Sequence, residues 1–228
     1  MTGGPEATGT TDRTRVRRAP DKQDGDVGAR DAVLAAALTG VVAVVDDGQP
    51  FALPVAVAPD TDPATGQARL LVHGSTGSRL FRLLAAGAPA CVTVTLLDGL
   101  VLARSQFESS MHYRCVVALG TFQPVPADDT ARALQVLTEH LMPGRSADAR
   151  PASRKETAAT LLLALPLAEW SLKVSAADPD DDPADLDRPV WAGVVPVRQV
   201  WGEPRTAPDL RVPLPVPAYV GAWPEGRA

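Results

Sequence analysis

Residues 73–79, with the sequence His-Gly-Ser-Thr-Gly-Ser-Arg, combine small, hydroxyl and cationic side chains in a pattern that suits an anion. They join an apolar, strand-like run at residues 68–72 to an amphipathic helical pattern at residues 78–86. Small residues let backbone N–H groups come close to a ligand, and the N–H groups that begin a helix favour a negative charge. Hydroxyl groups add hydrogen-bond donors, and an arginine supplies a planar fork that suits phosphate. We call residues 73–79 the cradle and interpret it as a phosphate-binding loop that includes His73, Gly74, Ser75, Thr76, Ser78 and Arg79.

Simple helix capping is the competing interpretation of the cradle. A serine or threonine before a helix commonly accepts a hydrogen bond from a first-turn amide, with no ligand involved. Known nucleotide-binding patterns do not decide between the two. The cradle lacks the Gly-Lys-Ser/Thr ending of a Walker loop and the Gly-x-Gly-x-x-Gly spacing of a dinucleotide-binding fold.

The composition is that of a globular protein with one sizeable domain. The chain has 228 residues, of which 45% are hydrophobic and 21% charged. A formal net charge of -5 and only 4% aromatic residues argue against nucleic-acid binding. No run approaches the roughly 18 apolar residues of a membrane span, and no apolar region follows the N-terminal arginines. We therefore expect a cytoplasmic protein with no membrane partner.

The cysteines and histidines give no metal signature. Cys91 and Cys115 lie in apolar, strand-like runs, which favours buried free thiols over a disulfide or a metal pair. The three histidines, His73, His112 and His140, have no cysteine or carboxylate neighbours at the spacing of a zinc site.

Hydrophobic periodicity divides the chain into three parts. Residues 1–25 are polar and charged and are predicted to form a disordered tail, residues 26–201 form the folded domain, and residues 202–228 form a Pro-rich extended segment. Two hairpin turns are predicted, at Asp46-Asp47-Gly48-Gln49 and at Asp98-Gly99. Six or seven strands joined mainly by hairpins, with inserted helices, predict a mainly β fold, a β-barrel with helical additions.

Four ordered segments together resemble the pyridoxamine 5′-phosphate oxidase-like family of FMN-binding split barrels. They are residues 46–54 (DDGQPFALP), the cradle, residues 93–104 and residues 109–120 (SSMHYRCVVALG). Their order and spacing are similar to those of the flavin-nucleotide-binding branch, which is related to the nitroimidazole-resistance reductases. The resemblance covers residues 15–201, most of the chain.

The resemblance implies a homodimer that holds two FMN molecules at the subunit interface. By the same resemblance, the cradle contacts the flavin phosphate and ribityl chain, and His73 lies near the flavin ring. Strand residues Thr93 and Thr95 correspond to positions along the flavin ring. The segment from Ser105 to Arg114 comes from the second half of the site, across the interface. The remaining cofactor-binding candidates are Arg104, Ser105, Tyr113 and Arg114.

Each candidate also has an interpretation that involves no ligand. His73 could be a solvent-facing polar residue, and Arg104 and Arg114 could form surface ion pairs. Threonine is favoured in strands whatever lies nearby, and Tyr113 could be a core residue. The chain also departs from true pyridoxamine-phosphate oxidases, because Ala207 stands where their C-terminal Arg-x-His pair has its histidine.

The leading hypothesis is an FMN-dependent oxidoreductase that acts on an unidentified small molecule, with the flavin rather than a catalytic triad or metal performing the redox chemistry. A non-catalytic flavin-binding or carrier protein is the first alternative. A split barrel with deazaflavin or haem is the second, and for haem the candidate ligands are His73 and His112.

Overall fold

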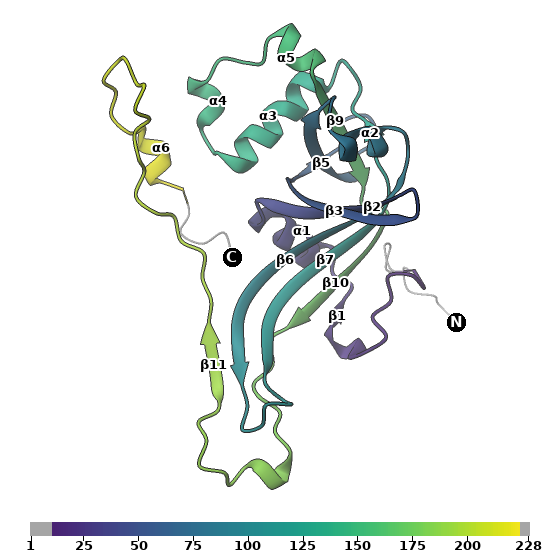
Figure 1. Cartoon of the computed structure of the whole chain (residues 1–228), viewed down its shortest axis with the longest axis vertical. Coiled ribbons are helices and arrows are strands. Elements are labelled where there is room, and N and C mark those ends of the chain that lie inside the picture. The colour runs from purple at the N-terminus through teal and green to yellow at the C-terminus, as the bar shows by residue number, and fades with distance from the viewer. Residues whose placement is uncertain (1–10, 224–228) are drawn as a thin grey trace.

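Two antiparallel sheets form the framework of the protein (Figure 1). The computed structural model describes residues 11–223. Within them, the larger sheet has the strand order β1-β10-β7-β6-β2-β3, with β11 also paired to β6, and the smaller sheet has the order β4-β5-β9-β8. The strands are β1 (Gln23–Asp24), β2 (Thr39–Asp46), β3 (Gln49–Ala56), β4 (Ala58–Thr61), β5 (Ala68–Ser75), β6 (Pro89–Leu102), β7 (Ser110–Thr121), β8 (Gln123–Pro124), β9 (Thr160–Pro166), β10 (Glu169–Ser175) and β11 (Gly193–Pro196).

Helices surround the upper part of this framework in Figure 1. They are α1 (Val27–Ala36), α2 (Arg79–Ala85), α3 (Thr130–Leu141), α4 (Arg145–Asp148), α5 (Arg154–Ala158) and α6 (Ala218–Gly221), with short 3₁₀ turns η1 (Pro20–Lys22) and η2 (Pro183–Asp185). No helix among residues 11–223 is long and apolar enough to cross a membrane.

Alternating side chains build the main core between the two sheets. On β2, Val42 and Val44 are buried while Val41 and Val45 are exposed, which is the period of two expected for a strand with one covered face. The same alternation on β6 buries Val92. The inward faces of both sheets meet in one apolar cluster that also includes Leu70, Val72, Val94, Val116, Leu163, Leu165, Trp170 and Leu172. This is the mainly β, barrel-like arrangement that the sequence predicted.

A second, smaller core lies on the other face of β5 and β9, where α3 covers it. Leu71, Ala164, Ala133 and Leu137 are buried there. Beside them, Arg69 of β5 is only 5% exposed and binds three carboxylates, those of Asp60, Asp62 and Asp129, at 2.5–2.8 Å. Arg132 of α3 binds two of the same carboxylates. The network joins β4, β5 and the start of α3.

The prediction of a hairpin turn was confirmed at one Asp-Gly pair and wrong at the other. Asp47 and Gly48 join β2 to β3 with φ values of 50° and 76°, as a two-residue hairpin requires. At Asp98-Gly99 the chain does not turn. Strand β6 continues to Leu102, and the pairing with β7 shifts register between Leu97 and Gly99, as at a β-bulge.

The terminal segments are more structured than the sequence predicted. Within residues 11–25, expected as part of a disordered tail, β1 pairs with β10, Thr14 is buried, and Arg13 forms an ion pair with Glu169. The rest of that tail, residues 1–10, lies outside the described residues. In the segment predicted as Pro-rich and extended (residues 202–228), residues 202–217 form no helix or strand, and α6 follows them.

We expect the substitution Arg69→Met to lower the free energy of unfolding by about 3 kcal/mol, because it leaves buried carboxylates without one partner while Arg132 still binds two of them. Denaturant unfolding measures the effect. Arg82→Met, at an exposed position of α2, is the matched control and should change stability by less than about 0.5 kcal/mol.

The same network predicts a pH dependence. Hydrogen bonds from Arg132, opposed by desolvation and supported by Arg69, hold the pKa of Asp129 at about 2. A carboxyl whose pKa is lower in the folded state stabilises the fold above its unfolded pKa of about 3.9. That contribution is lost as the pH falls towards 2. The difference in the free energy of unfolding between wild type and Arg69→Met should therefore become smaller as the pH falls from about 3.9 to about 2. A difference that stays constant over this pH range would contradict the role given to Asp129.

Candidate functional site

The cradle connects the end of β5 to the start of α2. Its turn is closed by local hydrogen bonds, in which the Ser78 amide donates to the Ser75 carbonyl at 2.9 Å and the Gly77 amide donates to Ser75 Oγ at 3.1 Å. The amide of Thr76 donates to the carbonyl of Ala159 at 3.0 Å, which ties the turn to the residue before β9. The loop is thus held in shape by its own backbone.

Helix capping by Ser78 does not explain the cradle. Ser78 is the N-cap residue of α2, but its side chain makes no capping hydrogen bond within the described chain. The hydroxyl that does bond a loop amide belongs to Ser75, and it bonds within the turn. The first-turn amides of α2 therefore receive no acceptor from the residue best placed to give one.

Gly74 has a packing reason to be glycine. A Cβ atom at this position would lie 2.3 Å from ring atoms of Phe81, a distance that real contacts do not reach. Phe81 is buried in the main core, so this close approach seats α2 against β5. Gly77 differs, because a Cβ there would meet only Ser75 Oγ at 3.5 Å.

Arg79 is bound to the hairpin between β2 and β3. Its guanidinium forms an ion pair with Asp46 and lies over the ring of Phe51, 4.9 Å from the ring centroid. The Arg79 side chain is 54% exposed, so a ligand can still reach it. Asp46 and Phe51 belong to residues 46–54, one of the four segments that resemble the family, but neither was predicted as a cofactor-binding residue. Their only sequence signal is membership of that segment.

His73 differs from the other two histidines in its bonding. The His112 ring is hydrogen-bonded to the Ala177 carbonyl at 2.8 Å, and the His140 ring to the Ala37 carbonyl at 2.7 Å. Within residues 11–223, the His73 ring makes no hydrogen bond. It is exposed on the same face of β5 as Leu71, yet nearby protein atoms partly desolvate it, and this lowers its pKa from the ordinary value. A lowered pKa keeps the ring neutral, the form that binds metals.

Three further candidates share the outward face of the long β6–β7 pair. Thr93 and Thr95 on β6 alternate with buried valines. Tyr113 on β7 points to the same side of the sheet, because it pairs with Leu97, which lies on the same face of β6 as the two threonines. The hydroxyl of Thr95 donates to Cys115 Sγ at 3.3 Å. This face therefore presents hydroxyls and a thiol.

The remaining arginine candidates are in ion pairs. Arg114 binds Asp98 through two hydrogen bonds of 2.7 and 2.9 Å, and Arg104 binds the buried carboxylate of Asp181 at 2.9 Å. Ser105 accepts a hydrogen bond from the Glu108 amide in the loop after β6. These contacts match the ion-pair interpretation of the arginines.

One subunit does not bring all of the candidates together. From Thr93 to Leu102, the strand runs roughly 30 Å, so Arg104 and Ser105 lie far from Thr93. Figure 1 shows the cradle, between β5 and α2, at one end of the molecule, while the lower ends of β6 and β7 point away from it. Among the candidates within residues 11–223, the six cradle residues lie together in one loop.

A framework of two antiparallel sheets with a loop–helix cradle defines the class of split-barrel proteins. Residues 26–174 match the family described as pyridoxamine 5′-phosphate oxidase, and the chain belongs to this family. Recognition of the family and of its split-barrel fold from four short segments is thereby confirmed. A comparison with curated protein sequences gave no match.

Two solved structures similar to this chain align over nearly its whole length, and a third shares the fold over two thirds of it. The FAD and heme binding protein from Mycobacterium smegmatis is 43% identical, with a TM-score of 0.84 over 90% of this chain and 98% of that one. The flavocytochrome Anf3 from Azotobacter vinelandii is 33% identical, with a TM-score of 0.86 over 96% and 99%. A putative 5-nitroimidazole antibiotic resistance protein from Bacteroides thetaiotaomicron is 18% identical, with a TM-score of 0.55 over 67% and 86%, and shares the fold.

Two alanine substitutions in the cradle separate packing from ligand contact. Gly74→Ala should lower the free energy of unfolding by about 1–3 kcal/mol, because the new methyl group overlaps Phe81. Gly77→Ala should leave stability nearly unchanged, since its Cβ meets only ordinary contact. Thermal unfolding of both variants checks this, and equal loss of stability in the two would contradict the packing role of Gly74.

Proposed function

We propose that this protein is a flavin-dependent redox protein that also binds haem, and that it works as a homodimer with its cofactors at the subunit interface. The observation that carries the proposal is 43% identity over 98% of a protein named for binding FAD and heme. The 33% identical flavocytochrome, aligned over 99% of its length, supports it. A flavin and a haem together supply two-electron and one-electron chemistry, while the protein binds, orients and shields them.

FAD is the flavin for which the 43% identical relative is named, whereas the sequence alone predicted FMN. FMN and FAD both carry phosphate, so both suit the cradle, and the roles proposed for the cradle residues are the same for either. Release of the bound flavin by acid, followed by chromatography against FMN and FAD standards, distinguishes them. Deazaflavin, the other alternative, has a different absorbance spectrum and is separated in the same experiment.

The cradle residues fit a flavin phosphate. The Ser78 side chain does not cap α2, which leaves amide donors at the loop–helix junction, and the exposed side of Arg79 adds a cationic fork. The carboxylate of Asp46 restrains that fork but also places a negative charge close to it. The Arg79–Asp46 pair therefore sets the position of the guanidinium. It also sets how strongly the guanidinium can donate hydrogen bonds to an anion.

His73 is the residue that fits a haem iron. Its ring is exposed, is held towards the neutral form by a lowered pKa, and makes no hydrogen bond within the described residues. A neutral imidazole is the common protein ligand of haem iron. Nε2 of His112 and Nε2 of His140 each bond a backbone carbonyl, which leaves at most Nδ1 of those two rings for a metal, whereas the described residues occupy neither nitrogen of His73.

The proposed activity is oxidation or reduction of a small molecule. A non-catalytic flavin carrier is the alternative, and it would share the cradle. Reduction of the bound flavin by NADH or NADPH, followed by reoxidation with turnover of an added acceptor, distinguishes the two. A purified protein without flavin absorbance, and with no fluorescence quenching on addition of FAD or FMN, would contradict both.

Paired substitutions test the role of Arg79. Arg79→Ala should weaken flavin affinity by about 1.5–3 kcal/mol, the range for a hydrogen bond to a charged group. Asp46→Asn should strengthen it, because it removes a negative charge beside the phosphate and frees the guanidinium. Fluorescence titration of the apoprotein measures both. If the two substitutions shift affinity in the same direction, or Arg79→Ala shifts it less than tenfold, Arg79 serves the hairpin and not the ligand.

A histidine pair tests the haem assignment. His73→Ala should abolish the haem Soret band while flavin absorbance is kept, because the iron loses its protein ligand. His112→Gln is the matched control, since His112 bonds a backbone carbonyl at the far end of the sheet, and it should keep both spectra. Loss of the Soret band in His112→Gln with its retention in His73→Ala would reverse the assignment.

A further inference from the structure

The C-terminal arm, which we define as residues 198–217, leaves β11 and stands off the rest of the chain (Figure 1). Every residue from Arg198 to Val216 is exposed. Among these residues the backbone forms no strand or helix, and the arm contains one short turn in which the Leu210 amide donates to the Ala207 carbonyl at 3.2 Å. The arm is thus not covered by its own subunit.

Both ends of the arm are fixed to the body of the protein. At its start, the Val197 amide donates to the carbonyl of Asp98 at 2.9 Å. After it, the indole of Trp223 donates to the Pro143 carbonyl at 3.0 Å, and its ring lies 5.2 Å from that of Trp201. Residues 202–217 therefore form an outward loop whose base is closed by two tryptophans.

The exposed surface of the arm is apolar. The exposed fractions of Leu210, Val212, Leu214 and Val216 are 45%, 61%, 64% and 46%. Prolines at 213, 215 and 217 each follow one of the residues Val212, Leu214 and Val216. They hold the chain extended, and every second residue therefore lacks a backbone N–H. The arm is preorganised for side-chain contact with an apolar surface and cannot add a regular strand to a sheet.

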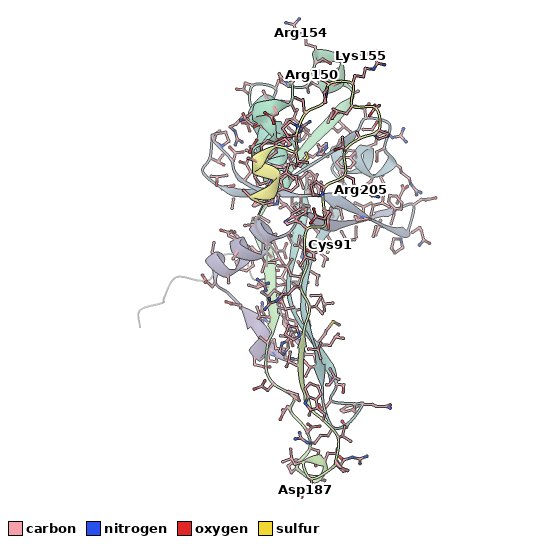
Figure 2. The ribbon with its side chains drawn as sticks, turned by 90° about the vertical axis from the view of Figure 1, so that its left-hand side faces the viewer. Cys91, Arg150, Arg154, Lys155, Asp187 and Arg205 are labelled. Carbon is pink, nitrogen blue, oxygen red and sulfur yellow. The ribbon has the colours of Figure 1, made fainter. Side chains whose placement is uncertain are left out.

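An apolar surface of matching character lies on the part of the sheet from which the arm departs. Leu97, Leu100 and Leu102 of β6 and Met111 of β7 are 37–49% exposed, and Val195 of β11 is 45% exposed beside them. Each of the two surfaces, on the sheet and on the arm, exposes several apolar side chains and is larger than an isolated surface leucine. Figure 2 shows Arg205 of the arm beside the upper part of the molecule, and Asp187 at the opposite, lower end of the sheet.

We propose that the C-terminal arm clasps a second copy of this chain, with Leu210, Val212, Leu214 and Val216 packed on the partner subunit. The inference rests on the proposed homodimer and adds the device that holds it together. A second copy is the occupant because the arm is continuous, through β11, with the exposed apolar face of β6, and because both ends are fixed, so the loop cannot fold back as a tail.

Limited trypsin digestion of the full-length, cofactor-loaded protein tests the clasp directly. The bonds after Arg198, Arg205 and Arg211 are exposed in the single chain, as is the bond after Arg18, which serves as the internal control. In the dimer we expect the arm bonds to be cut at least tenfold more slowly than the control bond. Arm bonds cut as fast as the control bond would overturn the proposal.

Sedimentation of a paired variant set provides the second measurement. Leu214→Asp should raise the dimer dissociation constant at least tenfold, whereas Leu186→Asp, at a similarly exposed leucine in the loop after η2, should leave it unchanged. Equal dissociation constants for wild type and Leu214→Asp would overturn the clasp. If the variant fails to fold, as judged by circular dichroism, the wild-type digestion decides.

The outcomes separate the clasp from the proposed function. A dimer that carries flavin and haem but has a freely cut arm refutes the clasp and leaves the redox assignment intact. A dimer with a protected arm but without flavin or haem spectra refutes the redox assignment and supports the clasp. A wild-type protein that sediments as a monomer refutes both the dimer and the clasp.

Discussion

The rest of the chain covers only one face of the sheet along strand β6. Along its upper part, Val92 and Val94 enter the core between the two sheets, so this half closes the barrel. Along its lower part, leucines are exposed on a sheet that no helix covers in Figure 1. Single-layer sheets with an apolar face are stable only when something packs on that face. The upper half of β6 therefore closes the barrel, and its lower half leaves an apolar face that the proposed second subunit would cover.

The cradle depends on the barrel in the same way. Gly74 admits the ring of Phe81, and this contact fixes how α2 leaves β5. Arg79, the first residue of α2, then reaches Asp46 in the hairpin between β2 and β3. The position of the cradle is thus set by one core contact and one ion pair. Because the two contacts come from different sheets, the closure of the barrel and the geometry of the cradle are coupled.

Sequence reasoning succeeded where the signal was local. The two positive φ values of Asp47 and Gly48 follow from residue type alone, and so does the alternation of valines in β2. The same dipeptide at Asp98-Gly99 does not turn. There the Asp98 carboxylate is bound by Arg114, and its carbonyl accepts from Val197, almost a hundred residues later. Contacts of that range override a two-residue propensity, and no spacing rule reveals them.

The candidate site shows the same division. Four short segments were sufficient to find the family, because their residue types, order and spacing are legible without any long-range contact. The partners of the arginines were not found, since Asp181 is 77 residues from Arg104 and Asp46 is 33 residues from Arg79. Residue type could not separate His73 from His112 either. The distinction is made by a backbone carbonyl that happens to lie within 2.8 Å of one ring.

The division of the candidates between two ends of the subunit is itself informative about the site. Roughly 30 Å of strand separates Thr93 from Leu102, so a ligand beside Thr93 lies far from Arg104 of the same chain. Arg104 and Arg114 are, moreover, already neutralised by aspartates within the subunit. They fit a structural role that keeps the far end of the sheet in shape. In the homodimer proposed above, the cofactor would be bound by the cradle and by residues that the second subunit places against the outward face of Thr93 and Thr95.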